Sequence, residues 1–213
     1  MRFYRSVRNV AVQVCLFNHI LGELNMPIEN IRVIAPFVGG GFGGKISNGQ
    51  AIQAVKLAKI AKKPVQLVWS RADEFFYDTF RPAAVVKIKS GLTDSGKIVS
   101  WDYSIYGMGG RGAQLFYNVP HHRTSVSRNL RNGDGMHPFA TGPWRAPDNN
   151  TNSFARESHI DVMANRAEMD PLEFRLKNLT DERMRGVLKA AAEKFGWTPA
   201  KAPSSRGFEG RIR

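Results

Sequence analysis

The chain has 213 residues, 42% hydrophobic and 23% charged, which is an ordinary globular composition and enough length to bury a core. Its 31 Lys and Arg against 18 Asp and Glu give a net charge of +13, which suits anionic partners, but the basic residues are scattered, which disfavours nucleic acid. The single Cys15 excludes an intramolecular disulfide. Because no stretch approaches the roughly 20 apolar residues of a membrane span and no signal-peptide cleavage site follows residues 10–21, we expect a soluble, cytoplasmic protein.

The first third of the chain predicts two helix–strand transitions. Apolar residues at helical spacing predict an amphipathic helix over residues 8–25. Residues 31–37 predict a short strand that leads into a glycine-rich loop, and residues 47–63 predict a helix that ends before Pro64. The β-rich residues 64–69 predict a second strand.

Alternating residues in the middle of the chain predict a hairpin. Two strands within residues 83–107 flank an Asp-Ser-Gly turn. In the first strand the alternation places on one face Val85, Lys87 and Lys89, and on the other Val86 and Ile88. Residues 107–150 are irregular and rich in Gly, Asn, Pro and Arg, which is too long for a connector and indicates a functional segment.

The last part of the chain predicts three helices. Residues 152–168 form one helix, whose inner face carries Ile160, Met163, Ala164 and Ala167. Asp170 caps the next helix, and Pro171 occupies its first turn. A third helix starts at Thr180, with a core stripe of Met184, Val187, Leu188, Ala191 and Phe195. The order of elements predicts an α+β (mixed α/β) architecture.

The loop "VGGGFGGK" fits two phosphate-binding patterns incompletely. A P-loop formed by Gly39, Gly44 and Lys45 requires Ser or Thr where Ile46 stands. A dinucleotide fingerprint requires an acidic residue about 20 positions later, and the chain has none between Glu29 and Asp73. Both interpretations therefore fail.

The five glycines of this loop still bring backbone N–H groups close to a partner at the end of a strand. Phe42, set among them, either fills the core or presents its ring and amide to a ligand. The alternative is a glycine-rich bulge that packs on a neighbouring strand.

Three segments in order carry a family resemblance: "GGGFGGK", then "RPAAVVKIKSGLTDSGKIVSWD", then "GPWRAPDNNTNSFARESHIDVMANRAEMDPLEFRLKNL". Together they resemble the molybdopterin-binding subunit of the xanthine dehydrogenase/aldehyde oxidoreductase family, in particular its isoquinoline oxidoreductase-like branch. The resemblance runs from about residue 25 to residue 207. It implies that residues 1–178 are part of a first molybdopterin-binding domain and that residues 179–213 begin a second one.

The resemblance also implies a chemistry. Members of the family hydroxylate aldehydes or N-heterocycles with oxygen from water, using molybdenum held by molybdopterin, which in bacteria is usually the cytosine dinucleotide form. The implied partners are the remainder of the molybdopterin subunit, an iron–sulfur subunit and a flavin subunit.

Carried over residue by residue, the resemblance implies a cofactor-binding set: Gly40, Gly41, Phe42, Gly43, Gly44, Arg145 and Ala146. Loop amides suit this role because they donate to oxo and phosphate oxygens without adding charge. Arg145 would lie beside the molybdenum as the catalytic residue that orients substrate or cofactor, since a guanidinium forks onto an oxyanion. The alternative for Arg145 is a surface arginine that stabilises a turn. No residue of the chain is expected to bind the metal directly.

The sequence also departs from the family. Ile46 replaces the glutamate that holds purines, so xanthine is not expected as a substrate. The general-base glutamate of the family lies far downstream and is not in this chain, and Glu209 does not match it. We therefore expect the chain alone to be inactive. The histidines fit no zinc-site spacing: His121, His122, His137 and His159.

Two other functions remain open on the sequence. A non-catalytic basic module would bind an anionic ligand or nucleic acid, with an affinity that falls steeply with salt. An assembly or scaffold protein would have kept the fold without the cofactor.

Overall fold

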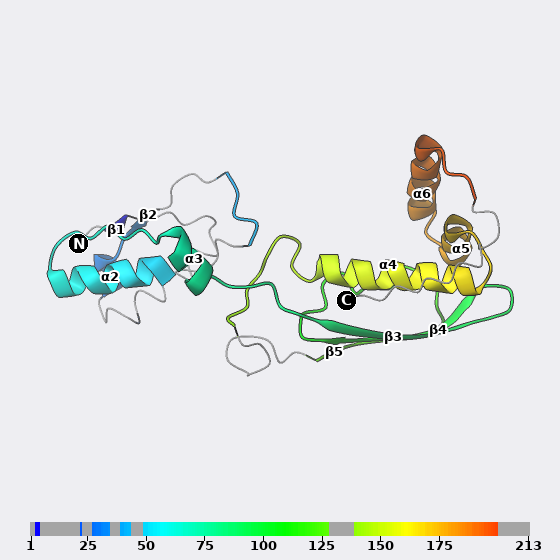
Figure 1. Ribbon diagram of the computed structural model, residues 1–213, viewed down its shortest axis with the longest axis horizontal. Helices are drawn as coiled ribbons and strands as arrows, with labels where there is room; N and C mark the ends of the chain where they lie inside the picture. The colour runs from blue at the N-terminus through cyan, green and yellow to red at the C-terminus, as the bar shows by residue number, and fades with distance from the viewer. Residues whose placement is uncertain are drawn as a thin grey trace. The chain divides into compact units, whose positions relative to one another are not determined.

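The computed structural model describes residues 3–4, 22, 27–34, 39–43, 49–127 and 139–199. The chain forms two compact units (Figure 1). Unit one comprises Met1–Pro82 and Leu130–Pro147, and unit two comprises Ala83–Asn129 and Asp148–Arg213. The expected domain boundary at residue 178 rests on the family resemblance and not on the compactness of the fold, and it stays a prediction.

Unit one is built from short elements. They are β1 (Phe3–Tyr4), the 3-10 helix η1 (Ile28–Asn30), β2 (Val33–Ile34), α2 (Gly49–Ala61) and α3 (Arg71–Tyr77), and β1 pairs parallel with β2. β2 lies inside the predicted strand over residues 31–37. The predicted helix over residues 8–25 lies outside the described residues, apart from the helical Gly22.

α2 confirms the helix predicted over residues 47–63. It buries Ala51, Val55 and Ala58, which recur at helical spacing and form one face. The helix ends before Lys62, whose φ of 52° is left-handed.

The strand predicted over residues 64–69 is wrong. The segment alternates between exposed and half-buried residues, yet it is in no ladder within the described part of the chain. Alternation reports which way side chains face, whereas a strand also needs a hydrogen-bonded neighbour. α3 follows directly and was not predicted, although the Ser70-x-x-Asp73 spacing is that of a capping box. The amide of Asp73 donates to Ser70 Oγ at 3.2 Å, and the amide of Ser70 donates to Asp73 Oδ2 at 2.9 Å.

Unit two is a helix layer on a three-stranded sheet. Its elements are β3 (Val85–Leu92), β4 (Ile98–Tyr106), β5 (His121–Ser127), α4 (Asn149–Arg166), α5 (Pro171–Asn178) and α6 (Glu182–Phe195). The strand order is β3-β4-β5, with β3 antiparallel and β5 parallel to β4. Figure 1 shows α4 running along one face of this sheet, with α5 and α6 beyond its end.

The predicted hairpin and its facing pattern are confirmed. β3 and β4 pair from Val85 opposite Tyr106 to Leu92 opposite Ile98. Alternate residues of β3 are exposed and half-buried, as the sequence predicted. β4 buries Trp101, Tyr103 and Ile105, which pack in one core with the predicted inner face of α4. Burial of these apolar side chains stabilises unit two.

β5 corrects the prediction that residues 107–150 are irregular throughout. Every residue of β5 is exposed, and its sequence HHRTSVS has no alternation of apolar and polar residues. A strand that lies at a sheet edge and buries neither face leaves no periodic signal in the sequence. Residues 107–120 connect the parallel strands β4 and β5 and contain neither helix nor strand.

α4 holds this irregular segment through buried polar side chains. Asn152 Nδ2 donates to the carbonyls of Gly109 at 3.1 Å and Arg111 at 2.9 Å. Tyr103 donates its hydroxyl to Asn152 Oδ1 at 3.0 Å. Burial raises the pKa of Tyr103 to about 12, so its hydroxyl remains a donor at neutral pH.

Arg156, one turn further along α4, is also buried and completes the attachment of the segment. Its Nη1 donates to the carbonyls of Gly112 at 2.5 Å and Gln114 at 3.1 Å. Its Nε pairs with Glu157 at 2.8 Å, so the buried charge has a counter-ion.

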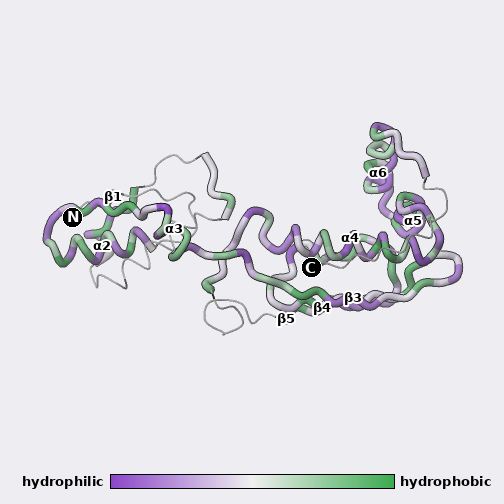
Figure 2. Tube along the Cα trace, in the orientation of Figure 1, coloured by the Kyte–Doolittle hydropathy of each residue, from purple (hydrophilic) through white to green (hydrophobic). Residues whose placement is uncertain are grey.

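The two last helices begin at aspartate caps. Asp170 Oδ1 accepts from the amides of Leu172 and Glu173, which confirms the predicted cap of α5. Asp181 rather than Thr180 caps α6, through the amide of Met184. The predicted core stripe of α6 is wrong, because α6 buries no residue. Figure 2 shows hydrophobic and hydrophilic residues interspersed along α6. Among the described residues, no helix combines the length and apolarity needed to cross a bilayer.

Asn178 joins α5 to the turn of the hairpin. Its Nδ2 donates to the carbonyls of Gly96 and Phe174, both at 3.0 Å, and its Oδ1 accepts from the amide of Ile98 at 2.9 Å. The side chain is buried, so water cannot replace these partners.

We expect Asn178→Ala to lower the free energy of unfolding of unit two by about 2–4 kcal/mol, because it leaves the Gly96 carbonyl and the Ile98 amide buried without partners. Chemical denaturation followed by circular dichroism measures the change. Asn165→Ala, at an exposed position of α4, is the matched control and should change stability by less than about 0.5 kcal/mol. Equal effects of the two substitutions would contradict this account.

Candidate functional site

The described part of the glycine loop, Gly39–Gly43, has a strained centre. Phe42 has a φ of 49° and Gly43 a φ of 90°, so two consecutive residues are left-handed. A phenylalanine rarely adopts such a backbone, and its ring is 62% exposed. Positive φ at an exposed aromatic residue is typical of a loop whose shape serves a function rather than a core.

A second loop of unit one, residues 139–147, is hydrogen-bonded to Phe80 and Arg81. The amide of Phe80 donates to the carbonyl of Ala140 at 2.9 Å, and the amide of Gly142 donates to the carbonyl of Phe80 at 3.0 Å. Arg81 Nη2 also donates to the carbonyl of Arg145 at 2.8 Å. These bonds hold the second loop from both of its halves.

The two loops meet backbone to backbone at Gly43. A Cβ atom at this position would lie 2.4 Å from the carbonyl oxygen of Pro143 and 2.8 Å from Cα of Trp144. Neither atom belongs to a flexible side chain, so only glycine permits this approach.

This contact brings Phe42 and Arg145 together. The guanidinium carbon of Arg145 lies 4.6 Å from the centre of the Phe42 ring, which is a cation–π contact. Arg145 is exposed, and it forms no ion pair with a carboxylate of the described residues. Two residues that are far apart in the sequence and that the motifs had singled out are therefore neighbours.

The remaining expected site residues lie on the same two loops. Gly40 and Gly41 are half-exposed, and a Cβ at Gly40 would meet the Phe42 ring at 2.9 Å. Ala146 is exposed and has a φ of 54°. Gly44 lies outside the described residues, so its place in the site stays a prediction.

The geometry fits an electron-rich ligand. Within the described part of the chain, no hydrogen bond engages the backbone N–H groups of Gly40–Gly43. Those donors and the exposed guanidinium of Arg145 lie on two loops that are in contact. Because glycine has no side chain, a ligand can approach the backbone of the first loop closely. This donor set suits oxo, phosphate or pterin atoms.

Sequence reasoning missed the residues that attach the second loop. Arg81 is the first residue of the second family motif and Phe80 directly precedes it, but nothing local in the sequence indicates that they bond to residues 140–145. These bonds join residues about 60 positions apart in the sequence, so they are visible only in the folded chain. Elsewhere in the described residues, no group of three His, Cys, Asp or Glu side chains is placed to hold a metal ion.

The chain matches a known protein family over most of its length. Residues 17–179 match the family described as the molybdopterin cofactor-binding domain. The chain belongs to this family. Both loops lie within the matched range, so the family match covers the whole candidate site.

The chain is also similar to curated subunits of oxidoreductases. The chain is 30% identical to the aldehyde oxidoreductase molybdenum-binding subunit PaoC of Escherichia coli, over 88% of this chain and 28% of PaoC. It is 24% identical to the isoquinoline 1-oxidoreductase subunit beta of Brevundimonas diminuta, over 88% of this chain and 26% of that subunit. The chain thus spans little more than a quarter of the relatives it matches.

Solved structures share the fold. CO dehydrogenase from Oligotropha carboxidovorans superposes with a TM-score of 0.70 at 18% identity, over 86% of this chain and 27% of that one. Aldehyde oxidoreductase from Desulfovibrio gigas superposes with a TM-score of 0.69 at 20% identity, over 84% of this chain and 22% of that one. The mixed α/β fold is therefore that of part of a molybdenum hydroxylase, as the sequence predicted.

We expect Gly43→Ala to separate the two loops, because the added methyl group would overlap the backbone of Pro143 and Trp144 and its φ would be strained. Amide hydrogen exchange of residues 139–147 should become at least about tenfold faster, which corresponds to a loss of about 1.4 kcal/mol of local stability. Gly39→Ala is the matched control, since its Cβ would meet no atom within 4 Å. Unchanged exchange in Gly43→Ala would show that the contact does not hold the loops.

Proposed function

We propose that the chain supplies part of the cofactor envelope of a molybdenum hydroxylase that acts on aldehydes or N-heterocycles. The observation that carries the proposal is the contact between the Phe42 loop and the Arg145 loop in a chain that belongs to the molybdopterin cofactor-binding family. The names of the relatives, an aldehyde and an isoquinoline oxidoreductase, support this substrate class.

Bound molybdopterin would supply the molybdenum that performs a two-electron oxidation with oxygen taken from water. The chain's own residues would bind and orient. The amides of Gly40–Gly43 would donate to electron-rich atoms of the cofactor, and because they are fixed by the backbone they need no reorganisation during the reaction. The Cβ-free surface of the loop would let the cofactor approach the main chain.

Arg145 would orient an oxygen of substrate or cofactor. The Phe42 ring centre lies 4.6 Å from the guanidinium carbon of Arg145, and this cation–π contact would restrict the position of the guanidinium. A planar fork held in this way recognises an oxyanion through two parallel hydrogen bonds. Phe42 is then a positioning residue for Arg145 as well as part of the loop.

The finer features of the enzyme are part of the same proposal. We infer the cytosine dinucleotide form of molybdopterin, a cytoplasmic location, and partners that carry iron–sulfur clusters and flavin. The general-base glutamate would come from the part of the subunit that this chain does not match. The chain alone would therefore not turn over substrate.

The first test is the molybdenum content of the chain, made in a host that assembles the cofactor, alone and together with the coding sequences adjacent to its own. We expect near-stoichiometric molybdenum, with fluorescence of released pterin, in the co-produced complex and little in the isolated chain. Phe42→Ala should reduce the bound molybdenum at least tenfold, while Phe154→Ala, an exposed phenylalanine of α4, should not.

Absence of molybdenum from the complex as well as from the chain would overturn the proposal. Salt-sensitive binding of generic DNA in that case would favour the basic binding module.

The second test separates binding from catalysis. We expect Arg145→Gln to keep the molybdenum but to lower kcat/KM for an aromatic aldehyde by about 10–100-fold, the usual cost of losing a charge-assisted hydrogen bond in the transition state. Arg111→Gln, an exposed arginine of unit two, is the matched control. If both variants retain full activity, Arg145 has no role in the reaction and is a surface arginine.

A further inference from the structure

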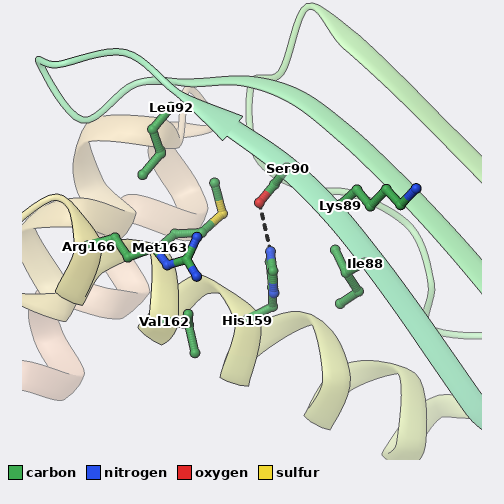
Figure 3. A pocket seen from close by; sticks show the side chains of 8 residues that line it. All are labelled: Ile88, Lys89, Ser90, Leu92, His159, Val162, Met163 and Arg166. Atoms are coloured by element: carbon green, nitrogen blue, oxygen red, sulfur yellow. Dashed lines mark hydrogen bonds between the residues drawn. The ribbon is translucent and has the colours of Figure 1, made fainter. Parts of the chain in front are cut away.

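A groove lies between β3 and α4 in unit two. Its volume is about 500 Å³, and its lining comes from the two elements alone: Ile88, Lys89, Ser90, Leu92, His159, Val162, Met163 and Arg166. Figure 3 shows the side chains of Ser90 and His159 directed toward each other across it. Because no residue of β4 or β5 lines the groove, it follows the outer margin of the sheet.

The floor of the groove combines an apolar surface with one polar pair. Ser90 Oγ and His159 Nε2 are 2.7 Å apart, and the His159 ring meets Trp101 edge-on at 5.3 Å. Burial, together with the charge of Arg166, holds the pKa of His159 below its ordinary value, so the ring is neutral at neutral pH. The pair is satisfied internally, which leaves Ile88, Leu92, Val162 and Met163 as the apolar part of the lining, beside the charged Arg166.

β3 is an edge strand. It pairs with β4 along one side, and no strand among the described residues pairs with its opposite side. Every second residue of such a strand directs its N–H and C=O groups outward, and these groups accept an added strand. The groove therefore lies where the side chains of an added strand would point toward α4.

The charges on β3 restrict which strand can be added. Lys87 and Lys89 lie on the exposed face of β3, where Lys87 Nζ lies 5.5 Å from the centre of the Tyr106 ring of β4 and Lys89 is opposite Asp102. Two copies of β3 placed edge to edge would bring four lysines together, which disfavours self-association. An acidic strand would instead place carboxylates beside the lysines, and the net charge of +13 favours such a partner over the whole chain.

We propose that an acidic, extended segment of the molybdopterin subunit, from the part that this chain does not match, adds to β3 as a further strand and sets an apolar side chain in the groove. This inference rests on the proposed function for the identity of the occupant. The aldehyde oxidoreductase subunit that the chain matches is long enough to contain such a segment, since the chain spans only 28% of it. No other described element covers the edge.

The test uses the full chain and a synthetic peptide of about eight residues, the length of β3, with alternating valine and glutamate and blocked ends. Hydrogen exchange of the β3 amides should slow about tenfold at millimolar peptide, while exchange of the β5 amides should not change. Lys87→Glu combined with Lys89→Glu should abolish the protection. Lys62→Glu combined with Lys63→Glu, at exposed positions of unit one, is the matched control and should preserve it.

Three further probes examine the occupant. A peptide of alternating valine and lysine should give no protection, and Val162→Trp, at a half-exposed position, should weaken the effect of the acidic peptide by filling the groove. Hexanoate tests the groove as a site for a small organic anion. Protection by hexanoate without protection by the acidic peptide would overturn the proposal, and so would equal protection by both peptides or none by either.

The peptide experiment contains no molybdenum, so its outcome is independent of the proposed function. Protection of β3 in a chain whose complex binds no molybdenum would leave the addition of an acidic strand standing, but it would remove the hydroxylase and with it the molybdopterin subunit as the source of that strand. A complex that binds molybdenum, together with a β3 that the acidic peptide does not protect, would support the hydroxylase and overturn the strand addition.

Discussion

Irregular backbone can be buried only if donors reach its carbonyl groups, and in unit two these donors come from one face of α4. Asn152 and Arg156 together bond to four carbonyls of residues 107–120, and Tyr103 holds Asn152 from the sheet side. The sheet, the helix and the connecting segment are therefore interdependent: removing the helical donors would leave the carbonyls unsatisfied inside the protein. The apolar core alone would not hold a segment so rich in polar backbone.

Unit one meets a similar requirement by a different means. Within its described residues, Gly39–Gly43, the loop that carries Phe42 has no long polar side chain to attach it, and it reaches residues 143–144 because Gly43 has no side chain. This close approach of two main chains accompanies the contact between the Phe42 ring and the Arg145 guanidinium. A binding surface made of main chain is well suited to a rigid cofactor, since little conformational entropy is lost when it binds.

Local patterns in the sequence predicted the elements that bury one face. α2, the β3–β4 hairpin, α4 and the cap at Asp170 all follow from spacing and capping residues. The failures share a cause, because β5, residues 64–69 and α6 owe their state to neighbours rather than to their own residue pattern. α6 has a strong apolar stripe, yet Val187 and Phe195 are 65% and 79% exposed. For the candidate site, the motifs indicated Phe42 and Arg145 through resemblance, whereas their contact and the Phe80 and Arg81 bonds that position it depend on the folded chain.

The parallel pairing of β4 and β5 has a consequence for how the gene can vary. Parallel neighbours in one sheet need a connection of about a dozen or more residues, because the chain must return to the same end of the sheet before it can run alongside. Residues 107–120 are close to that minimum and carry no regular element that could be shortened. Length changes in this segment are thus tolerated in one direction: codons can be gained at its exposed positions, but few can be lost before the third strand is detached.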